Sequence, residues 1–227
     1  MRRVLGVGDF ALCVVVLPSD AERSTRNAKP QTPVPHTVTI LIFDDVELLD
    51  VAGPFEVFSV AGREGAFDVQ TVAETTNPIR TRGGLTVTPD MPLQDASAAD
   101  VLVVPGGQGA RTAMHRDAVL DWVRTGAETA EIVLSVCTGA FILAQAGLLS
   151  GCTVTTHHSV LDRLAELAPD AAVVDDQRFV DNDAIVTAAG ISAGIDAALH
   201  VVGRLCGSAH AAATARHMEY TPPSPMA

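Results

Sequence analysis

Three short runs of β-branched and apolar residues recur along the chain and limit the folds that it can adopt. They lie at Thr37–Phe43, Val101–Val104 and Ile132–Val136, and none of them alternates with charged residues. Runs of this kind are typical of strands that are buried on both faces, as in a parallel sheet covered by helices. Because parallel strands need a crossover connection, the runs predict an α/β fold with a mostly parallel central sheet.

The segments between these runs have the spacing of helices. Apolar residues recur at helical intervals from Leu48 to Val60, and Pro54 lies where that helix could begin. Further helices are expected at 118–128, from 139 to 146 with Gly147 as C-cap, and at 159–167, 193–205 and 209–217. Additional strands are expected at 67–73 and 154–156, with a hairpin of 178–180 and 184–187 around a turn at 181–183.

The composition fits one domain with a large aliphatic core. The chain has 227 residues, of which 48% are hydrophobic and only 4% aromatic. Its formal net charge of -12 disfavours a nucleic-acid partner, because an acidic surface repels phosphates. The four cysteines show no CxxC pair and no zinc-ligand spacing, so we expect reduced thiols in the cytoplasm and no metal.

The N-terminal residues differ in character from the rest. Arg2 and Arg3 precede an apolar run, Val4–Leu17, that Asp9 interrupts and that is too short to span a membrane. A polar, proline-rich stretch follows at Ser19–Pro35. We therefore expect residues 1–36 to be an extension that is loosely ordered or that reflects a misplaced start codon. Residues 37–222 are expected to form the domain, and residues 223–227 a tail.

Cys137 is the residue with the clearest chemical setting. It follows a buried strand and opens a helix, where backbone N–H groups and the helix dipole favour a thiolate, the nucleophilic form. Gly139 removes bulk from the turn. The alternative is a small hydrophobic residue packed at a strand end. Cys13, Cys152 and Cys206 lack this setting and are interpreted as structural.

Two other strand ends carry candidate partners for this thiol. The turn Pro105–Gly109 could present backbone N–H groups to a developing negative charge, although an ordinary βα turn would have the same sequence. Asp50 is an acid inside an apolar run, which is costly to bury unless it has a task or a partner. Glu47 fits a solvated loop charge better.

Two adjacent histidines follow the strand expected at 154–156. His157 or His158 could act as a base beside the cysteine, or either could be a hydrogen-bonded histidine at the rim of the core. The remaining candidates, His115, His200, His210 and His217, have no evident partner in the sequence.

In their joint order, these segments resemble the ThiJ/PfpI superfamily, which is similar to class I glutamine amidotransferases, and most closely its isocyanide hydratase branch. The resemblance extends from about Val38 to Pro222. It rests on Ile42–Pro54, Val104–Gly107, Ser135–Ala140, Ala146–Leu149, Thr155–His157, Ala193–Asp196 and Met218–Tyr220.

The resemblance implies a flavodoxin-like three-layer sandwich with a nucleophile elbow, and a homodimer. It implies catalytic roles for Cys137 as nucleophile and Asp50 as its acidic partner. Residues implied to border the substrate are Thr138, Gly106, Gly107 and His157. The branch usually has Trp where this chain has His158, a departure that could change the substrate.

The implied reaction is the addition of water to a small electrophile, an isocyanide, without a cofactor. Glyoxalase-like and amidase-like activities of the superfamily are alternatives. A further alternative is a stand-alone ligand or redox sensor related to the N-terminal domain of AraC-type transcription regulators. That arrangement needs a helix-turn-helix region after the core, and we expect none in the few residues that follow Tyr220.

Overall fold

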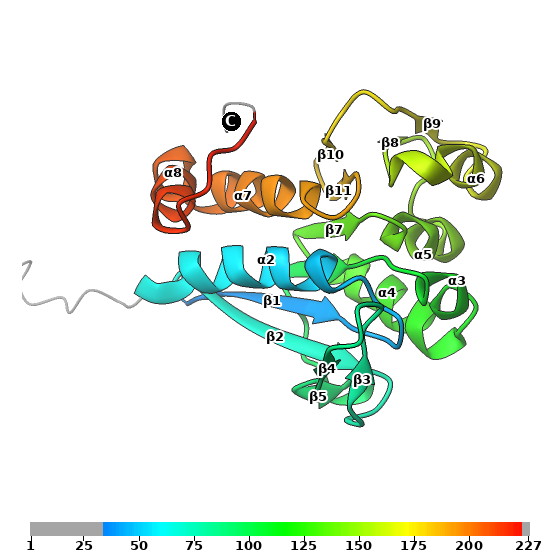
Figure 1. The fold of residues 1–227 in the computed structure, drawn as a ribbon, viewed down its shortest axis with the longest axis horizontal. Coiled ribbons are helices and arrows are strands. Elements are labelled where there is room, and N and C mark those ends of the chain that lie inside the picture. Colours follow the sequence, from blue (N-terminus) through cyan, green and yellow to red (C-terminus); the bar gives the residue numbers. More distant parts are fainter. Residues whose placement is uncertain (1–33, 224–227) are drawn as a thin grey trace, which may run out of the picture. The chain divides into compact units, whose positions relative to one another are not determined.

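The computed structural model describes residues 34–223, which contain one seven-stranded sheet with helices on both faces (Figure 1). Its strand order is β10-β11-β7-β6-β1-β2-β5, and only the edge pair β10–β11 is antiparallel. The prediction of a flavodoxin-like fold with a mostly parallel sheet is confirmed. The strands are β1 (His36–Leu41), β2 (Phe67–Ala73), β5 (Met91–Pro92), β6 (Val101–Val104), β7 (Ile132–Val136), β10 (Phe179–Asn182) and β11 (Ile185–Ala188).

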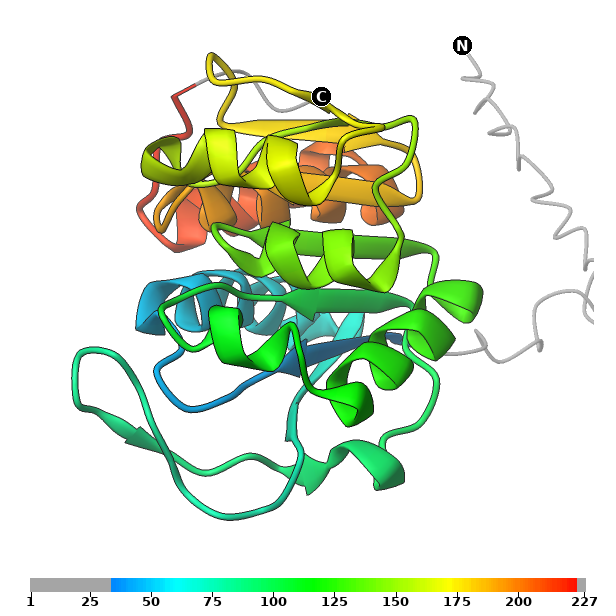
Figure 2. The same cartoon turned by 90° about the vertical axis from the view of Figure 1, so that its right-hand side faces the viewer.

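Each face of the sheet is covered by its own layer of helices. The first layer contains α2 (Leu48–Ala61), α7 (Ala193–Cys206) and α8 (Ser208–His217) (Figure 1). The second contains α3 (Ala110–Ala113), α4 (Asp117–Thr129), α5 (Gly139–Ala146) and α6 (Leu161–Leu167) (Figure 2). Phe58 in the first core and Phe141 in the second are almost fully buried, which explains why the central strands are apolar on both faces.

Short elements complete the described part of the chain. They are the hairpin β3 (Ile79–Arg80) with β4 (Thr86–Val87), the parallel pair β8 (Thr153–Val154) with β9 (Ala172–Val173), and three 3₁₀ turns at Gly62–Glu64, Leu93–Asp95 and His158–Val160.

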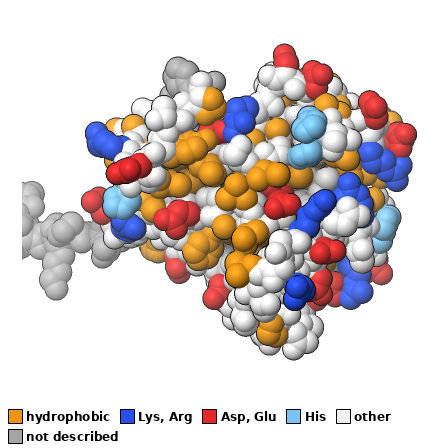
Figure 3. Space-filling view, viewed as in Figure 1, with side chains coloured by type: hydrophobic (Ala, Val, Ile, Leu, Met, Phe, Trp, Pro, Cys, Tyr) orange, Lys and Arg blue, Asp and Glu red, His pale blue; other side chains and the backbone are white. Residues whose placement is uncertain are grey.

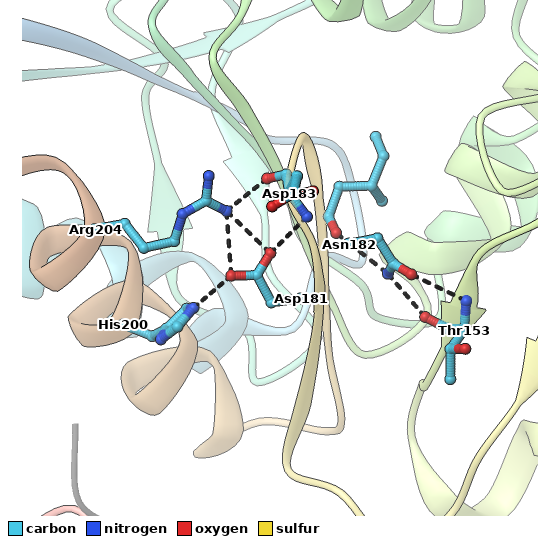
Figure 4. A network of polar contacts seen from close by, with 7 residues as sticks. Thr153, Asp181, Asn182, Asp183, His200 and Arg204 are labelled. Carbon is cyan, nitrogen blue, oxygen red and sulfur yellow. Dashed lines mark hydrogen bonds and ion pairs between the residues drawn. The ribbon is translucent and has the colours of Figure 1, made fainter. Parts of the chain in front are cut away.

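Four local predictions need correction. The strand expected at 154–156 is the two-residue strand β8, which ends at Val154. Helix α2 begins at Leu48, so Pro54 lies inside the helix rather than at its start, and lacking an N–H it cannot donate to the carbonyl of residue 50. The helix expected at 159–167 begins as a 3₁₀ turn. Asp181 and Asn182 belong to β10 rather than to the turn, because they pair with Val186 and Ile185 of β11. The Asn182 side chain also exchanges two hydrogen bonds with the backbone of Thr153 at 2.8 and 3.0 Å (Figure 4).

Several expectations fall outside the described residues. These are the apolar run at 4–17, Cys13, nearly all of the predicted extension and residues 224–227 of the tail. Strand β1 begins at His36, one residue before the expected start of the domain. Within residues 34–223, none of the helices has the length and apolar character needed to cross a membrane.

Candidate active site

The fold brings three of the predicted site segments to one edge of the sheet. Strands β7, β6 and β1 are neighbours, and their carboxyl ends lead into Cys137, into the glycine turn at 105–109 and into the loop before α2. In doubly wound sheets, ligands bind beyond these strand ends. The candidate site is therefore built from segments that lie almost 100 residues apart in the sequence.

Cys137 occupies a strained bend between β7 and α5. Its φ is 55°, a left-handed conformation that is costly for a residue with a side chain. Its N–H donates to the carbonyls of Ala188 and Ala189 at 3.1 and 2.8 Å, and its carbonyl accepts from the Thr156 hydroxyl at 2.6 Å. These three hydrogen bonds hold the bend.

Two glycines allow the chain to pass close to this bend. A Cβ on Gly139 would lie 2.0 Å from the carbonyl oxygen of Val104, and a Cβ on Gly106 would lie 2.5 Å from the backbone nitrogen of Thr138. Neither distance is sterically possible for a real Cβ. The glycines at these positions are therefore required by the contact between the two strand ends.

Asp50 is completely buried in the first turn of α2 and is held on both carboxyl oxygens. The Gly106 N–H donates to Oδ2 and the Ile191 N–H donates to Oδ1, each at 3.1 Å. Ile191 itself has a φ of 57°, so its amide reaches Asp50 through a second strained turn. The two N–H groups satisfy a carboxyl group that would otherwise be very costly to bury.

The glycine turn has a different use from the one expected. The Gly106 N–H holds Asp50, and the Gly107 N–H donates to the Thr138 hydroxyl oxygen at 3.0 Å. The Thr138 hydroxyl in turn donates to the Gly107 carbonyl at 3.0 Å. Both amides were candidates to bind a developing negative charge, but each has a protein partner. The turn therefore positions the acid and the residue after the nucleophile.

Burial dominates the ionisation of both catalytic candidates. Burial raises the pKa of Asp50 from 3.8 to about 7. The charge of Glu47 also raises this pKa, whereas the hydrogen bonds from the N–H groups of Gly106 and Ile191 lower it. Burial and the Asp50 charge raise the pKa of the Cys137 thiol to about 12, although the Thr138 N–H and hydroxyl lower it. Near neutral pH the pair therefore holds at least one proton, and the expected resting thiolate is disfavoured.

His157 lies at the rim of this site. A Cβ on Gly190 would lie 2.2 Å from its ring, so the imidazole packs directly on the backbone that leads to Ile191. Its Nδ1 pairs with the Ser159 hydroxyl at 2.9 Å, and its ring lies 4.4 Å from that of His158. Burial, with smaller effects from His158 and Arg82, lowers the pKa of His157, which favours the neutral imidazole.

Sequence reasoning missed the groups that act through the backbone. The Ile191 N–H holds Asp50, and the carbonyls of Ala188 and Ala189 hold Cys137; no side-chain pattern identifies such groups.

Other candidates lie away from the site. His200 pairs with Asp181, His210 with the Ala61 carbonyl and His217 with Arg63, while Cys152 and Cys206 are free thiols.

Among the described residues, no three His, Cys, Asp or Glu side chains are placed to share a metal ion. The groups around Cys137 can instead exchange a proton between a sulfur and a carboxyl group, which requires no added group.

Residues 36–204 of the chain match the family model described as the DJ-1/PfpI family. The chain is 35% identical over 190 residues to the isonitrile hydratase of Pseudomonas putida, covering 83% of this chain and 80% of that protein. It is 30% identical over 179 residues to the HTH-type transcriptional regulator GbdR of Pseudomonas aeruginosa, covering 77% of this chain and 48% of that regulator. A crystal structure of a ThiJ/PfpI family protein from Pseudomonas syringae has a TM-score of 0.77 at 26% identity, covering 92% of this chain and 84% of that chain.

Proposed function

Because the chain belongs to the DJ-1/PfpI family, we propose that it is a cysteine-dependent hydratase that converts an isocyanide into an N-substituted formamide. The observation that carries this proposal is the pairing of a buried Asp50, whose pKa is raised to about 7, with Cys137 at a strained strand–helix bend. The similarity to an isonitrile hydratase supports the choice of substrate class.

The first step forms a carbon–sulfur bond. The Cys137 sulfur attacks the terminal carbon of the isocyanide while its proton passes to the Asp50 carboxylate. The carbon atom gains the electron pair and takes the proton back from Asp50, which gives a thioimidate bound to the sulfur. Since the thiol is protonated at rest, the anion exists only while the attack proceeds.

The second step adds water. The Asp50 carboxylate accepts a proton from a water molecule, whose oxygen attacks the thioimidate carbon. Asp50 passes this proton to the nitrogen. The carbon–sulfur bond of the resulting tetrahedral species then breaks as its hydroxyl group becomes the carbonyl and gives its proton, through Asp50, to the sulfur, and the N-substituted formamide leaves. Cys137 recovers its proton, so one isocyanide and one water yield one formamide, and no cofactor is consumed.

The assay is direct. Purified protein is mixed with an alkyl or an aryl isocyanide, and formamide is measured by chromatography. We expect turnover by the wild type, a loss of more than about 10³-fold in Cys137→Ala, and a large loss in Asp50→Asn. Cys206→Ala is the matched control and should keep its activity. Absence of turnover in the wild type, or full activity in Cys137→Ala, contradicts the proposal.

The same assay separates the enzymatic alternatives. Methylglyoxal and simple amides are offered in parallel, and conversion of one of these in place of the isocyanide would identify a glyoxalase-like or amidase-like protein.

We propose that the enzyme works in the reducing cytoplasm as a homodimer. The hydrophobic side chains that gather over α2 and α7 in Figure 3 are a suitable surface for a second copy.

A sensor is the second candidate, and the similarity to the regulator GbdR favours it. In that case Cys137 would report a ligand or an oxidant instead of turning over a substrate. Mild peroxide followed by mass spectrometry tests the redox form. Selective oxidation of Cys137 over Cys152 and Cys206, in a protein without turnover, would favour the sensor.

A further inference from the structure

A cavity of about 500 Å³ lies beside the candidate active site, and Cys137 is not part of its lining. Its walls come from the segment after β1 (Ile42–Asp45), the end of β2, Ile79 of β3 and the region from Gln108 to Val119. The turn at 105–109 separates it from Cys137, since Gly106 contacts Cys137 and Gly109 lines the cavity. A volume of this size is typical of small-molecule sites.

The position of the cavity in the topology is also typical of a ligand site. From β1 the chain crosses over α2 to β2 on one side, while from β6 it crosses over α4 to β7 on the other side. The crevice between the carboxyl ends of β1 and β6 is therefore a topological switch point. Both strands lead directly into segments that line the cavity.

Arg111 is the arginine of this cavity that has no carboxylate partner among residues 34–223. Its one hydrogen bond to the described part of the chain joins Nη1 to the Gly107 carbonyl at a long 3.4 Å, and its guanidinium lies 5.8 Å from the centre of the Phe141 ring. A guanidinium offers five N–H donors. The second arginine, Arg116, is already paired with Glu74 at 2.6 Å.

Two exposed carboxylates, Asp44 and Asp45, line the same cavity from the loop after β1. One carboxylate oxygen of Asp44 accepts a hydrogen bond from the backbone N–H of Arg80 at 3.1 Å, whereas no residue between 34 and 223 donates to the Asp45 carboxylate. A purely anionic ligand would be repelled by these acids, and a purely cationic one by Arg111. The lining of the cavity also includes apolar side chains, among them Phe43, Ala73 and Val119.

From this arrangement, we propose that the cavity is a second ligand site, which binds a small zwitterion with an apolar body. The anionic group of the ligand contacts Arg111, the cationic group contacts Asp44 and Asp45, and the apolar body packs on Phe43. Gln108 and Thr112 line the same cavity and can donate hydrogen bonds to the anionic group. The site is chemically different from that of Cys137, which receives an uncharged electrophile.

Binding is tested on the full-length, isotopically labelled chain by nuclear magnetic resonance, so the result does not depend on catalysis. The probes are L-phenylalanine, 3-phenylpropanoate, which lacks the ammonium group, and 2-phenylethylamine, which lacks the carboxylate. We expect saturable shifts of the Ala73 and Thr112 amide signals with L-phenylalanine, and affinities about tenfold lower for each single-charge analogue. The Gly151 signal, from a turn that does not line the cavity, should not move.

Variants assign the charges. Arg111→Gln and Asp45→Asn should each weaken L-phenylalanine about tenfold, whereas Arg163→Gln on α6 should leave its affinity unchanged. Arg163 is the matched control because it is an exposed arginine whose partner is Glu166. If Arg111→Gln fails to fold, the exposed Asp45 decides. The proposal is overturned by the absence of saturable shifts, by equal affinity for the three probes, or by wild-type affinity in Asp45→Asn.

Discussion

At the scale of single residues, ionisation of Asp50 disfavours ionisation of the neighbouring Cys137 thiol. The helix N-terminus was expected to make the thiol anionic, and the Thr138 N–H does favour the anion. Burial and the neighbouring carboxylate outweigh it, because neither charge can be solvated by water. In such a site, a proton can move between the Cys137 sulfur and the Asp50 carboxyl group during a reaction, while a thiolate at rest is disfavoured.

The raised pKa of Asp50 predicts how stability depends on pH. Its folded-state pKa of about 7 exceeds its ordinary value of 3.8, so the native state binds more protons than the unfolded state between these values. The free energy of unfolding must then fall as pH rises through this window, by about 2–4 kcal/mol for this group. Urea unfolding at pH 5 and pH 8 should show this fall in the wild type and a smaller one in Asp50→Asn. Equal falls in both proteins would contradict the assignment.

A second cluster supports the turn that holds Asp50. The Tyr220 hydroxyl donates to buried Asp196 at 2.7 Å, the other oxygen of Asp196 pairs with Arg178 at 2.5 Å, and Arg178 also donates to the Ser192 hydroxyl at 3.2 Å. Ser192 directly follows Ile191, whose N–H binds Asp50. The cluster thus connects the C-terminal segment to the candidate active site.

Removing the Tyr220 hydroxyl should therefore destabilise the protein. We expect Tyr220→Phe to lower the free energy of unfolding by about 1–2 kcal/mol, because Asp196 loses one of its two partners while the ring keeps its packing. Urea unfolding followed by Trp122 fluorescence measures the change. A value within about 0.5 kcal/mol of the wild type would show that water replaces the hydroxyl without cost.

The side chains of the candidate site were easier to single out from the sequence than the hydrogen bonds that hold them. Cys137 and Asp50 were singled out because a thiol at a strand–helix bend and an acid in an apolar run are unusual. The role of Ile191 could not be predicted, because it rests on one backbone N–H and a left-handed φ that an isoleucine side chain does not signal. The use of the Gly106 and Gly107 amides was missed for the same reason.

At the scale of elements, length decided what could be predicted. Strands β2, β6 and β7 were predicted to the residue, because each is a continuous run with clear ends. The two-residue strands β3, β4 and β9 and the four-residue helix α3 are too short to show a period. For the same reason, the strand expected at 154–156 shares only Val154 with β8. Tertiary hydrogen bonds, such as those of the Asn182 side chain to β8 in Figure 4, fix these pieces instead.

The end of α5 provides a clean test of a glycine C-cap. Gly147 has a φ of 81°, and a Cβ added there would meet nothing within 4 Å. Gly147→Ala should therefore destabilise the protein by about 1 kcal/mol through backbone conformation alone. Gly83→Ala is the matched control: it is equally open but has no positive φ, so urea unfolding should show no loss there. Equal effects at both positions would contradict this explanation.

At the scale of the whole molecule, two sites of different chemistry meet at one edge of the sheet. The turn between β6 and α3 contacts Cys137 on one side and lines the charged cavity on the other. Charged and histidine side chains gather at this end of the molecule, on the right of Figure 3, toward which β1 points in Figure 1. Under the two proposals, one edge of the fold binds both an electrophile and a zwitterion.

The net charge of the chain predicts its behaviour toward DNA. A formal charge of -12 repels a phosphate backbone, and counterion release requires arginine and lysine contacts that an acidic surface supplies poorly. We expect no binding to a fluorescent duplex by anisotropy at about 10 µM protein, even at low salt, where electrostatic binding is strongest. Adding L-phenylalanine should not change this, because occupying the cavity leaves the net charge as it is. Binding that weakens steeply with added salt would contradict the prediction and would favour the sensor over the hydratase.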